Sequence, residues 1–386
     1  MALHFTRDEF NGRVAAARHA LAEAGLDAIL LFSQESLYYL TGFDSSGYVF
    51  FQCAVLTADE RPIVLLTRRP DLEQAKRTSI IEDIRLWYDA EGADPAADLK
   101  GILAELGLAG RRVGVELATY GLTPANWERV RAALDGYCAL SDASLLIRAL
   151  RVVKSPAEIA YARRAAGLAD DSLEAMIDRA GPGVFEGAIN AVGVDAILAG
   201  GGELAASGPV FGSGERALLV RASAGTTSLG ERDQLTMEFG AAYRRYHACL
   251  MRTVAIGAGD PRQERMFEVT RDALSAMTEA ATPGRPLGEI DDAHRRVFDA
   301  AGLGAARMAA CGYSLGATFR PTWMDVPPML YSGNPMIARP GMVLFLHAIL
   351  ADAEHTLAMS LGHTIVVTES GREALTRHAP AYTICR

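Results

Sequence analysis

The sequence predicts two α/β domains in one chain, and three observations carry that prediction. The chain has 386 residues, which exceeds the size of a typical single hydrophobic core, so two domains are expected. Half of its residues are hydrophobic, which suits a large buried interior and excludes disorder. In its first part, stretches with helical spacing alternate with apolar runs of strand length, an order typical of layered α/β structure.

The first domain is expected over residues 1–148. Its opening helix begins after Thr6 in a capping-box pattern and ends before Gly25. An apolar run of strand length follows, and then two such runs joined by a short polar turn predict a β-hairpin. A further strand and a further helix continue the alternation. The ranges expected for these elements are 28–32, 53–57 with 62–67, 112–116, and 122–134.

The second domain is expected over residues 149–386. Ser155, which is followed by a proline, predicts a helix start, because serine caps a helix and proline fits the first helical position. A long amphipathic helix is expected from there to about Arg179. Glu238 and His347 each lie in an apolar stretch with a strand pattern, so both are expected on β-strands.

Composition excludes several classes of function. A net charge of −9 argues against a nucleic-acid partner, which requires a basic surface. The five cysteines are scattered and contain no CxxC pair, which is typical of free thiols in a reducing compartment. The first residues lack a signal-peptide pattern, and no apolar run approaches the ~20 residues that a membrane span needs. We therefore expect a cytoplasmic protein without a membrane partner.

Several phrases of the chain occur together in a fixed order. Met-Glu-Phe-Gly opens the stretch 237–253, which ends in Arg-Thr, and Pro-Gly-Met-Val at 340–343 and Val-Thr-Glu-Ser-Gly at 367–371 follow it. With Tyr-Leu-Thr-Gly at 39–42 and Lys-Ser-Pro-Ala-Glu-Ile at 154–159, these phrases resemble the superfamily of creatinase, prolidase and methionine aminopeptidase. The resemblance covers almost the whole chain. It implies an N-terminal creatinase-type α/β domain followed by a C-terminal pita-bread (α+β) catalytic domain.

The metal ligands of this superfamily are mostly replaced here. In metal-dependent members, two aspartates, one histidine and two glutamates hold two divalent ions. The resemblance places these positions on Glu238, Cys249, Tyr313, His347 and Gly362. Only one carboxylate remains, whereas a dinuclear site needs bridging carboxylates and hard ions need several oxygen ligands. We therefore expect no metal and no other cofactor. A mononuclear zinc site from Glu238, Cys249 and His347 stays open as an alternative, because all three are zinc ligands in other proteins.

The candidate catalytic residues are the polar groups at or beside these positions. Glu238 has apolar neighbours, so its carboxylate is expected to face a pocket and to act as general base or nucleophile. A buried acid paired with an arginine is the structural alternative. Tyr313 and His347 are candidate polarising or proton-shuttling groups, with core packing as the alternative for both. His363 is a further candidate proton shuttle. Cys249 is a weaker candidate nucleophile, because burial would make its thiol inert.

The candidate substrate-binding residues in the second domain follow from the same resemblance. Arg221 stands where related enzymes commonly have a substrate-facing histidine, and an arginine there can hold a carboxylate through two hydrogen bonds. Phe319 and Trp323 are expected to form an apolar wall or to stack on a cationic ring. Tyr246 and His247 join this set because they lie in a phrase shared with ectoine hydrolases.

Among metal-free members, the chain resembles ectoine hydrolases more than creatinases. Glu-x-Gly at 238–240 and Gly-Tyr-Ser-x-Gly at 312–316 resemble the ectoine-hydrolase pattern, whereas the catalytic histidine position of creatinases is Arg221 here. Because ectoine hydrolases open a cyclic amidine with a glutamate, the resemblance implies metal-independent hydrolysis of a non-peptide C–N bond. The expected substrate is a small zwitterionic amidine or amide, opened as ectoine is or cleaved as creatine is. A metal-dependent Xaa-Pro-type aminopeptidase with an atypical site, or an inactive protein that binds small ligands or peptides, remain as alternatives.

Assembly is the last expectation from the sequence. Metal-free members resemble one another in working as homodimers, in which the N-terminal domain of one chain closes the pocket of the other. Arg68 and Arg69, immediately after a predicted strand, are candidates for contact with a substrate carboxylate across that interface. A solvated loop is the alternative for this pair.

Overall fold

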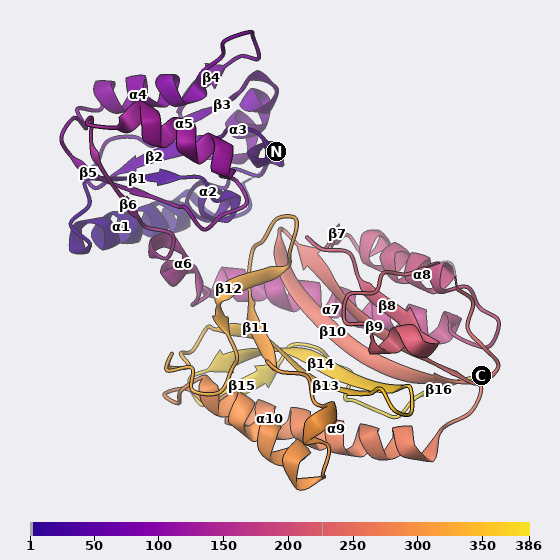
Figure 1. Ribbon diagram of the computed structural model, residues 1–386. Helices are drawn as coiled ribbons and strands as arrows, with labels where there is room; N and C mark the ends of the chain where they lie inside the picture. The colour runs from indigo at the N-terminus through magenta and orange to yellow at the C-terminus, as the bar shows by residue number, and fades with distance from the viewer. Residues whose placement is uncertain (1–2, 226) are drawn as a thin grey trace. The chain divides into compact units, whose positions relative to one another are not determined.

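The chain divides into two compact units, Met1–Arg151 and Val152–Arg386, in a computed structural model that describes residues 3–225 and 227–386 (Figure 1). The division falls three residues after the expected end of the first domain at residue 148. Helix α6 (Leu146–Arg151) explains the difference, because its Ile147 is buried in a hydrophobic cluster of the first unit. The boundary therefore follows the end of a packed helix.

The first unit is a six-stranded sheet between two layers of helices. Its strand order is β4-β3-β2-β1-β5-β6. The strands are β1 (Ala28–Leu31), β2 (Cys53–Thr57), β3 (Val64–Arg68), β4 (Asp83–Trp87), β5 (Arg112–Val115) and β6 (Ala139–Asp142). The helices are α1 (Arg7–Glu23), α2 (Gln34–Thr41), α3 (Leu72–Thr78), α4 (Pro95–Glu105), α5 (Pro124–Leu134) and α6. Side chains of α1, α2 and α6 pack on one face of the sheet, and those of α4 and α5 pack on the other (Figure 1).

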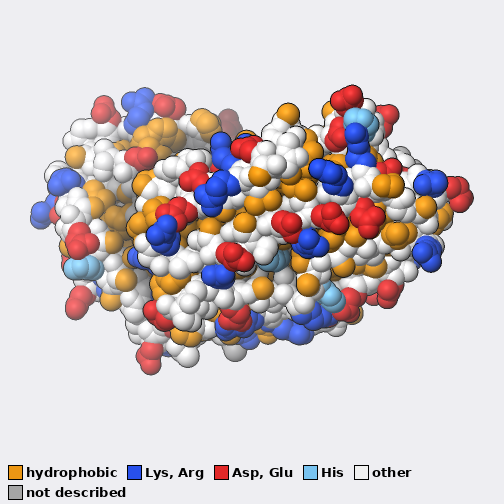
Figure 2. Space-filling model, turned by 90° about the horizontal axis from the view of Figure 1, so that it is seen from below, with side chains coloured by type: hydrophobic (Ala, Val, Ile, Leu, Met, Phe, Trp, Pro, Cys, Tyr) orange, Lys and Arg blue, Asp and Glu red, His pale blue; other side chains and the backbone are white. Residues whose placement is uncertain are grey.

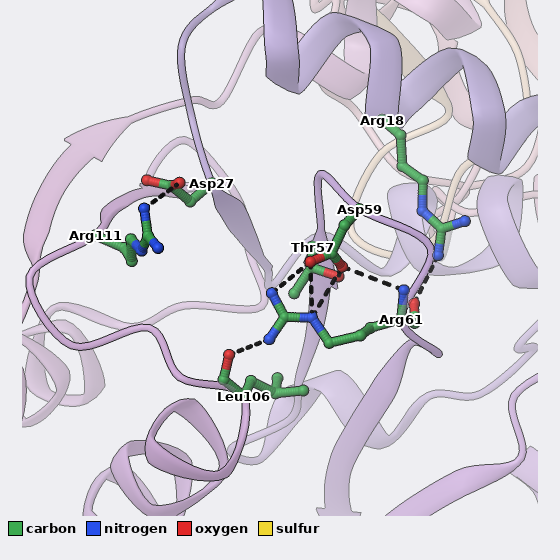
Figure 3. Close-up of polar contacts among 7 residues, drawn as sticks. All are labelled: Arg18, Asp27, Thr57, Asp59, Arg61, Leu106 and Arg111. Atoms are coloured by element: carbon green, nitrogen blue, oxygen red, sulfur yellow. Dashed lines mark hydrogen bonds and ion pairs between the residues drawn. The ribbon is translucent and has the colours of Figure 1, made fainter.

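The predicted β2–β3 hairpin is confirmed, and polar contacts hold its turn. The Arg61 guanidinium donates to both carboxylate oxygens of Asp59, with a shortest contact of 2.6 Å, and the Thr57 hydroxyl donates to the same carboxylate (2.8 Å) (Figure 3). Arg18 of α1 donates to the Arg61 carbonyl oxygen (2.6 Å), and Arg61 also donates to the Leu106 carbonyl oxygen. The turn is thereby tied to one helix on each side of the sheet.

The second unit is built on a ten-stranded sheet. Its main strand order is β12-β11-β13-β14-β10-β9-β7, and β15, β16 and β8 pair with β14, β10 and β9. The strands are β7 (Glu203–Leu204), β8 (Val210–Ser213), β9 (Asp233–Tyr243), β10 (Tyr246–Ile256), β11 (Gly312–Leu315), β12 (Met324–Met329), β13 (Val343–Asp352), β14 (Leu357–Thr368), β15 (Gly371–Ala374) and β16 (Ile384–Cys385). The helices are α7 (Pro156–Arg179), α8 (Glu186–Ala199), α9 (Pro261–Ala280) and α10 (Gly288–Ala300). Short 3₁₀ helices are η1 (Gly47–Val49) and η2 (Arg69–Asp71) in the first unit, and η3 (Gly214–Leu218) and η4 (Gly304–Ala306) in the second.

All four helices of the second unit cover the same face of its sheet. Leu250 of β10 packs in a cluster with side chains of α7 and α8, whereas Leu361 of β14 and Leu346 of β13 pack in a cluster with side chains of α9 and α10. Strand register places these three leucines on one face, because side chains alternate along each strand. By the same alternation, the side chains of Glu238 and His347 point to the face opposite to these leucines. The fold therefore leaves the other face of the sheet for the candidate site.

The predicted start of α7 is confirmed in detail. The Ser155 hydroxyl accepts from the Glu158 backbone N–H, and the Glu158 carboxylate accepts from the Ser155 backbone N–H, which together form a capping box. Within the described residues, no helix is long and apolar enough to cross a membrane. On the face in Figure 2, acidic and basic side chains of the described residues are interspersed.

Candidate active site

One row of cross-strand neighbours brings two predicted catalytic residues to the same face of the sheet. Glu238 on β9 pairs with Met251 on β10, Met251 pairs with Gly362 on β14, and Gly362 pairs with His347 on β13. Side chains in such a row point to the same side of a sheet. Glu238 and His347 therefore share the helix-free face, three strand spacings or roughly 14 Å apart along the sheet.

A second row lies beside the first. Gly240 pairs with Cys249, Thr364 pairs with Phe345, and Phe345 pairs with Tyr313. The Thr364 hydroxyl joins the two halves of this row, because it accepts from the Cys249 N–H (2.8 Å) and donates to the Cys249 carbonyl oxygen (2.9 Å). The Tyr313 ring and the Cys249 thiol are thereby fixed next to the Glu238 row.

A chain of hydrogen bonds ends at Glu238. The Trp323 indole N–H donates to the Tyr313 hydroxyl oxygen (2.8 Å), and the Tyr313 O–H donates to Glu238 Oε1 (3.2 Å). Burial, with the nearby Glu238 and Cys249, raises the pKa of Tyr313 well above its usual range, so the phenol keeps its proton. Because a phenol has a single hydrogen to donate, Tyr313 in this arrangement orients Glu238.

The carboxyl group of Glu238 has a strongly perturbed acidity. Burial raises its pKa to about 7, while the Tyr313 hydrogen bond and the positive charge of Arg221 act in the opposite direction. Arg221 itself is exposed, on the loop that follows η3. A carboxylate with this pKa exchanges protons readily near neutral pH, which is the property that a general base requires. Arg221 lies close enough to influence that equilibrium electrostatically.

His347 is a neutral imidazole at ordinary pH. Burial, with a smaller effect of His294, lowers its pKa to about 4. Its ring lies against two aromatic side chains, with centroid distances of 5.8 Å to Tyr313 and 5.4 Å to Phe345. Among the described residues, His347 Nδ1 is buried and has no hydrogen-bond partner. A buried polar atom in this state is available to a ligand.

The side chains at the superfamily's metal positions do not fit a pair of divalent ions. A Cβ atom at Gly362 would lie 2.8 Å from Phe345 Cζ and 3.0 Å from the Leu346 carbonyl oxygen, so the Phe345 ring fills the place of a side chain there. Within the described part of the chain, no three His, Cys, Asp or Glu side chains form a group that could hold a metal ion. Glu238, Cys249 and His347, the donors of the alternative zinc site, are therefore not gathered into such a group among the described residues. Burial also raises the pKa of the Cys249 thiol well above its usual range, which disfavours the thiolate that a metal or a nucleophilic role needs.

Two predicted site residues lie on the helix-covered face instead. The Tyr246 hydroxyl donates to Glu158 of α7 (2.5 Å), and His363 Nε2 is hydrogen-bonded to the Thr278 hydroxyl of α9 (2.9 Å). Burial lowers the pKa of His363 to about 4. His363 follows Gly362 on the same strand, so alternation turns it away from Glu238. The structure thus separates both residues from the Glu238 face.

His247 and Phe319 are buried near the turn between β9 and β10. His247 Nε2 accepts from the Ala206 N–H (2.9 Å), and Nδ1 lies 3.2 Å from the Thr318 hydroxyl. The Phe319 ring lies under the Arg245 guanidinium, with 5.1 Å between that group and the ring centroid. His247 therefore holds the loop before β8 against the loop after β11, a structural role for which its sequence gives no separate signal.

The predicted arginine pair lies in the first unit and its two members differ. Arg68 forms an ion pair with Asp89, and its guanidinium lies 3.9 Å from the centroid of the Phe50 ring. Arg69 is exposed. Arg68 is thus engaged within its own unit, whereas Arg69 presents its side chain to solvent.

Sequence reasoning missed Phe345 and Thr364, which shape the site as much as the predicted residues do. Phe345 lies two residues before His347 on the same strand, so the period-two alternation was a signal that could have found it. The role of Thr364 depends on the pairing of β10 with β14, which no local pattern shows.

The comparisons with known proteins agree on the family and differ on the substrate. The chain matches the model of metallopeptidase family M24 over residues 160–369 and that of the creatinase/prolidase N-terminal domain over residues 13–153. It is 26% identical to an ectoine hydrolase of Halomonas elongata, across 97% of each chain. It is 28% identical to a probable dipeptidase PepE of Mycobacterium bovis, across 88% of this chain and 87% of that protein. The crystal structure of dipeptidase PepE from Mycobacterium ulcerans superposes with a TM-score of 0.86 at 23% identity, covering 99% of both chains.

Proposed function

Since the chain belongs to metallopeptidase family M24, whose model spans residues 160–369, we propose that it is a hydrolase that needs no metal ion. Its substrate in this proposal is a small zwitterionic amidine or amide, and the bond that it breaks is a non-peptide C–N bond. The similarity to an ectoine hydrolase over nearly the full length supports this class of substrate.

The observation that carries the proposal is the state of Glu238. Its pKa of about 7 and its hydrogen bond from Tyr313 give the site one oriented base, while the donors at the other metal positions do not fit divalent ions. A general base is most effective when its pKa lies near the working pH. The site thus retains a group that can activate water without a metal-bound hydroxide.

In the proposed reaction, ionised Glu238 takes a proton from water as the water oxygen bonds to the amidine carbon and the electron pair of the C=N π bond moves onto its nitrogen. The ring C–N bond then breaks as the added hydroxyl becomes the amide carbonyl, and both the electron pair of the C–N bond and the hydroxyl proton go to the leaving nitrogen. The proton held by Glu238 passes to that nitrogen, so the carboxylate returns to its starting state. Water and the cyclic amidine together give an N-acylated diamino acid.

The remaining side chains orient the base and the substrate in this proposal. Tyr313, held by Trp323, keeps the Glu238 carboxylate in place. The unpartnered Nδ1 of His347 offers a hydrogen bond to a substrate nitrogen or oxygen, because a neutral imidazole has one donor and one acceptor nitrogen. Arg221 holds the substrate carboxylate, consistent with its exposure and with its electrostatic effect on Glu238.

A substrate panel tests the proposal. Purified protein is incubated with cyclic amidino acids, N-acylated amino acids and Xaa-Pro dipeptides, with and without EDTA, and ring opening or amine release is followed. We expect turnover of the amidine or amide class that survives EDTA. Glu238→Gln should lose on the order of a hundredfold or more in turnover, because the amide keeps the shape and cannot take the proton.

Three outcomes would contradict the proposal. Activity that EDTA abolishes and manganese, cobalt or zinc restores would indicate a metal-dependent peptidase. Turnover of Xaa-Pro dipeptides alone would show that the protein hydrolyses a peptide bond and not the proposed non-peptide C–N bond. Binding of these compounds without turnover would indicate a binding protein. Labelling with ¹⁸O-water distinguishes the role of Glu238, because a single-turnover reaction through a covalent ester would leave label in its carboxylate.

A further inference from the structure

A mostly apolar cavity of about 240 Å³ lies in the second unit, and its lining residues do not include the catalytic candidates described above. Its walls come from α7 and α8, from the loop at 205–209 and from the middle of β9. The lining includes Met176 and Ile197 on the helix side and Phe239 and Gly240 on the strand side. Arg320 is the charged side chain among the lining residues.

The cavity coincides with a break in the edge of the sheet. Along β9, strand β8 pairs with residues 235–238 and β7 pairs with Ala241 and Ala242. Within the described residues, Phe239 and Gly240 have no strand partner on that edge. The loop at 205–209 passes the break instead, held by the hydrogen bond from the Ala206 N–H to His247.

Two residues join this cavity to the Glu238 face. Gly240 lines the cavity, and a Cβ atom there would lie 3.1 Å from Cys249 Sγ and 3.6 Å from the Ala205 methyl group. Ala205 lines the cavity too, and it packs against the cluster that contains Tyr313 and Cys249. Gly240 also follows Glu238 by two residues, so both point to the same face of β9. Gly240 and Ala205 are therefore the lining residues that connect the cavity to the side of the sheet on which Glu238 lies.

We propose that this cavity binds an apolar substituent carried by the substrate next to the C–N bond that is broken, a hydrocarbon group larger than methyl. The proposal rests on the proposed function and names the substrate class within it. The volume favours such a group, because an apolar cavity of about 150 Å³ already accommodates benzene. A cyclic amidine with only a methyl group on its amidine carbon would leave most of the space unfilled. Desolvation of a larger substituent then contributes to substrate preference.

A substituent series tests this inference. The probes are cyclic amidino acids that carry methyl, propyl or phenyl on the amidine carbon, and kcat/KM is measured for each. We expect the wild-type protein to prefer propyl or phenyl over methyl by about tenfold or more, since one methylene in an apolar pocket changes specificity by that order. Val194→Phe, which adds a ring to a half-buried lining residue of α8, should reduce or reverse this preference.

A matched variant and a reciprocal variant accompany this measurement. Ala191→Phe adds the same ring to an exposed position of α8 outside the cavity, and it should leave the preference unchanged. Ile197→Val widens the cavity and should move the preference towards the larger probe, which keeps the inference testable if Val194→Phe does not fold. Equal kcat/KM for the three probes, or the same preference in all variants, would overturn the inference while leaving the hydrolase proposal in place.

Equilibrium binding separates the two proposals. Calorimetry with the phenyl probe is carried out on Glu238→Gln alone and on its combinations with Val194→Phe and with Ala191→Phe. Weaker binding with Val194→Phe and unchanged binding with Ala191→Phe would support the cavity even if no probe is hydrolysed. Equal binding in all three would reject the cavity even if the wild-type protein is active.

Discussion

At the scale of single residues, the properties of Glu238 and His347 come from where the fold buries them. The same carboxyl group would be fully ionised at neutral pH in water, whereas burial brings its pKa to about 7. The same imidazole would titrate near neutrality in water, whereas burial lowers its pKa to about 4. The fold therefore gives the glutamate a pKa near neutrality and keeps the histidine neutral.

Glu238→Gln should show that ionisation of the buried Glu238 carboxyl group destabilises the folded protein. The folded pKa of Glu238 lies above its ordinary value of 4.5, so this group's contribution to stability falls as pH rises through about 7. Glutamine carries no such charge. We expect the variant to be more stable than the wild-type protein at pH 8, by at most about 3 kcal/mol, and equal to it near pH 4. Urea unfolding at both pH values measures this, and equal stability at pH 8 would mean that Glu238 is not desolvated.

Tyr313→Phe should change the pH dependence of catalysis. The Tyr313 hydrogen bond lowers the pKa of Glu238, so its removal should raise that pKa and move the acidic limb of kcat/KM to higher pH. The rate at neutral pH should fall by on the order of tenfold, the value of a hydrogen bond to a charged group. Trp323→Phe removes the donor to the tyrosine oxygen together with part of a buried ring, leaves the Tyr313 hydroxyl in place, and should give a smaller shift in the same direction. If the pH profile of kcat/KM is unchanged in Tyr313→Phe, a group other than Glu238 produces its acidic limb.

At the scale of single elements, Gly362 and Phe345 together decide what the centre of the sheet can hold. These residues lie on neighbouring strands, and the aromatic ring occupies the space that a side chain at 362 would need. A carboxylate restored at position 362 would therefore not restore a ligand in the right place. Position 362 therefore has neither a donor atom nor free room for a side chain.

Gly362→Ala should destabilise the second unit by about 1–3 kcal/mol, the usual cost of overpacking a core. Its methyl group would lie within 3.0 Å of both the Phe345 ring and the Leu346 backbone. Phe345→Leu should recover part of the loss by removing the ring, a coupling that a double-mutant cycle measures. Gly167→Ala in α7 is the control, because nothing lies within 4 Å of its added methyl, and it should stabilise the protein by about 0.5–1 kcal/mol. Free energies of unfolding measured with denaturant should follow this order, and a different order would show that the Phe345 ring does not limit the space at position 362.

At the scale of the whole molecule, the fold is shared by proteins with different reactions. The dipeptidase PepE of Mycobacterium ulcerans superposes on nearly the entire chain, and the chain is also similar to an ectoine hydrolase of Halomonas elongata over 97% of each sequence. Function in such a family is decided by a few side chains on a common scaffold.

Assembly is a further expectation at this scale, and the exposed Arg69 makes it testable. We expect a homodimer, because closed two-fold assemblies are the commonest oligomers. Arg69→Ala should raise KM for an anionic substrate without changing the dimer, since its side chain is exposed. Arg68→Ala should instead lower stability, by up to about 1 kcal/mol, because Arg68 is paired with Asp89 and stacked on Phe50. Light scattering that shows a monomer at working concentration would exclude a site shared between two chains. An unchanged KM in Arg69→Ala would show that Arg69 does not contact the substrate.

Local patterns in the sequence were enough to predict several helices and strands, the order of the two domains and a strand around Glu238. Local signals suffice for these, since Thr6 and Ser155 cap their helices and the apolar run around Glu238 has the pattern of a strand. The hydrogen bonds that link Trp323, Tyr313 and Glu238, and the contact of His363 with α9, could be found only in the folded chain. Those facts depend on the register between distant strands and on the burial that it produces, and neither is encoded in any local stretch of the chain.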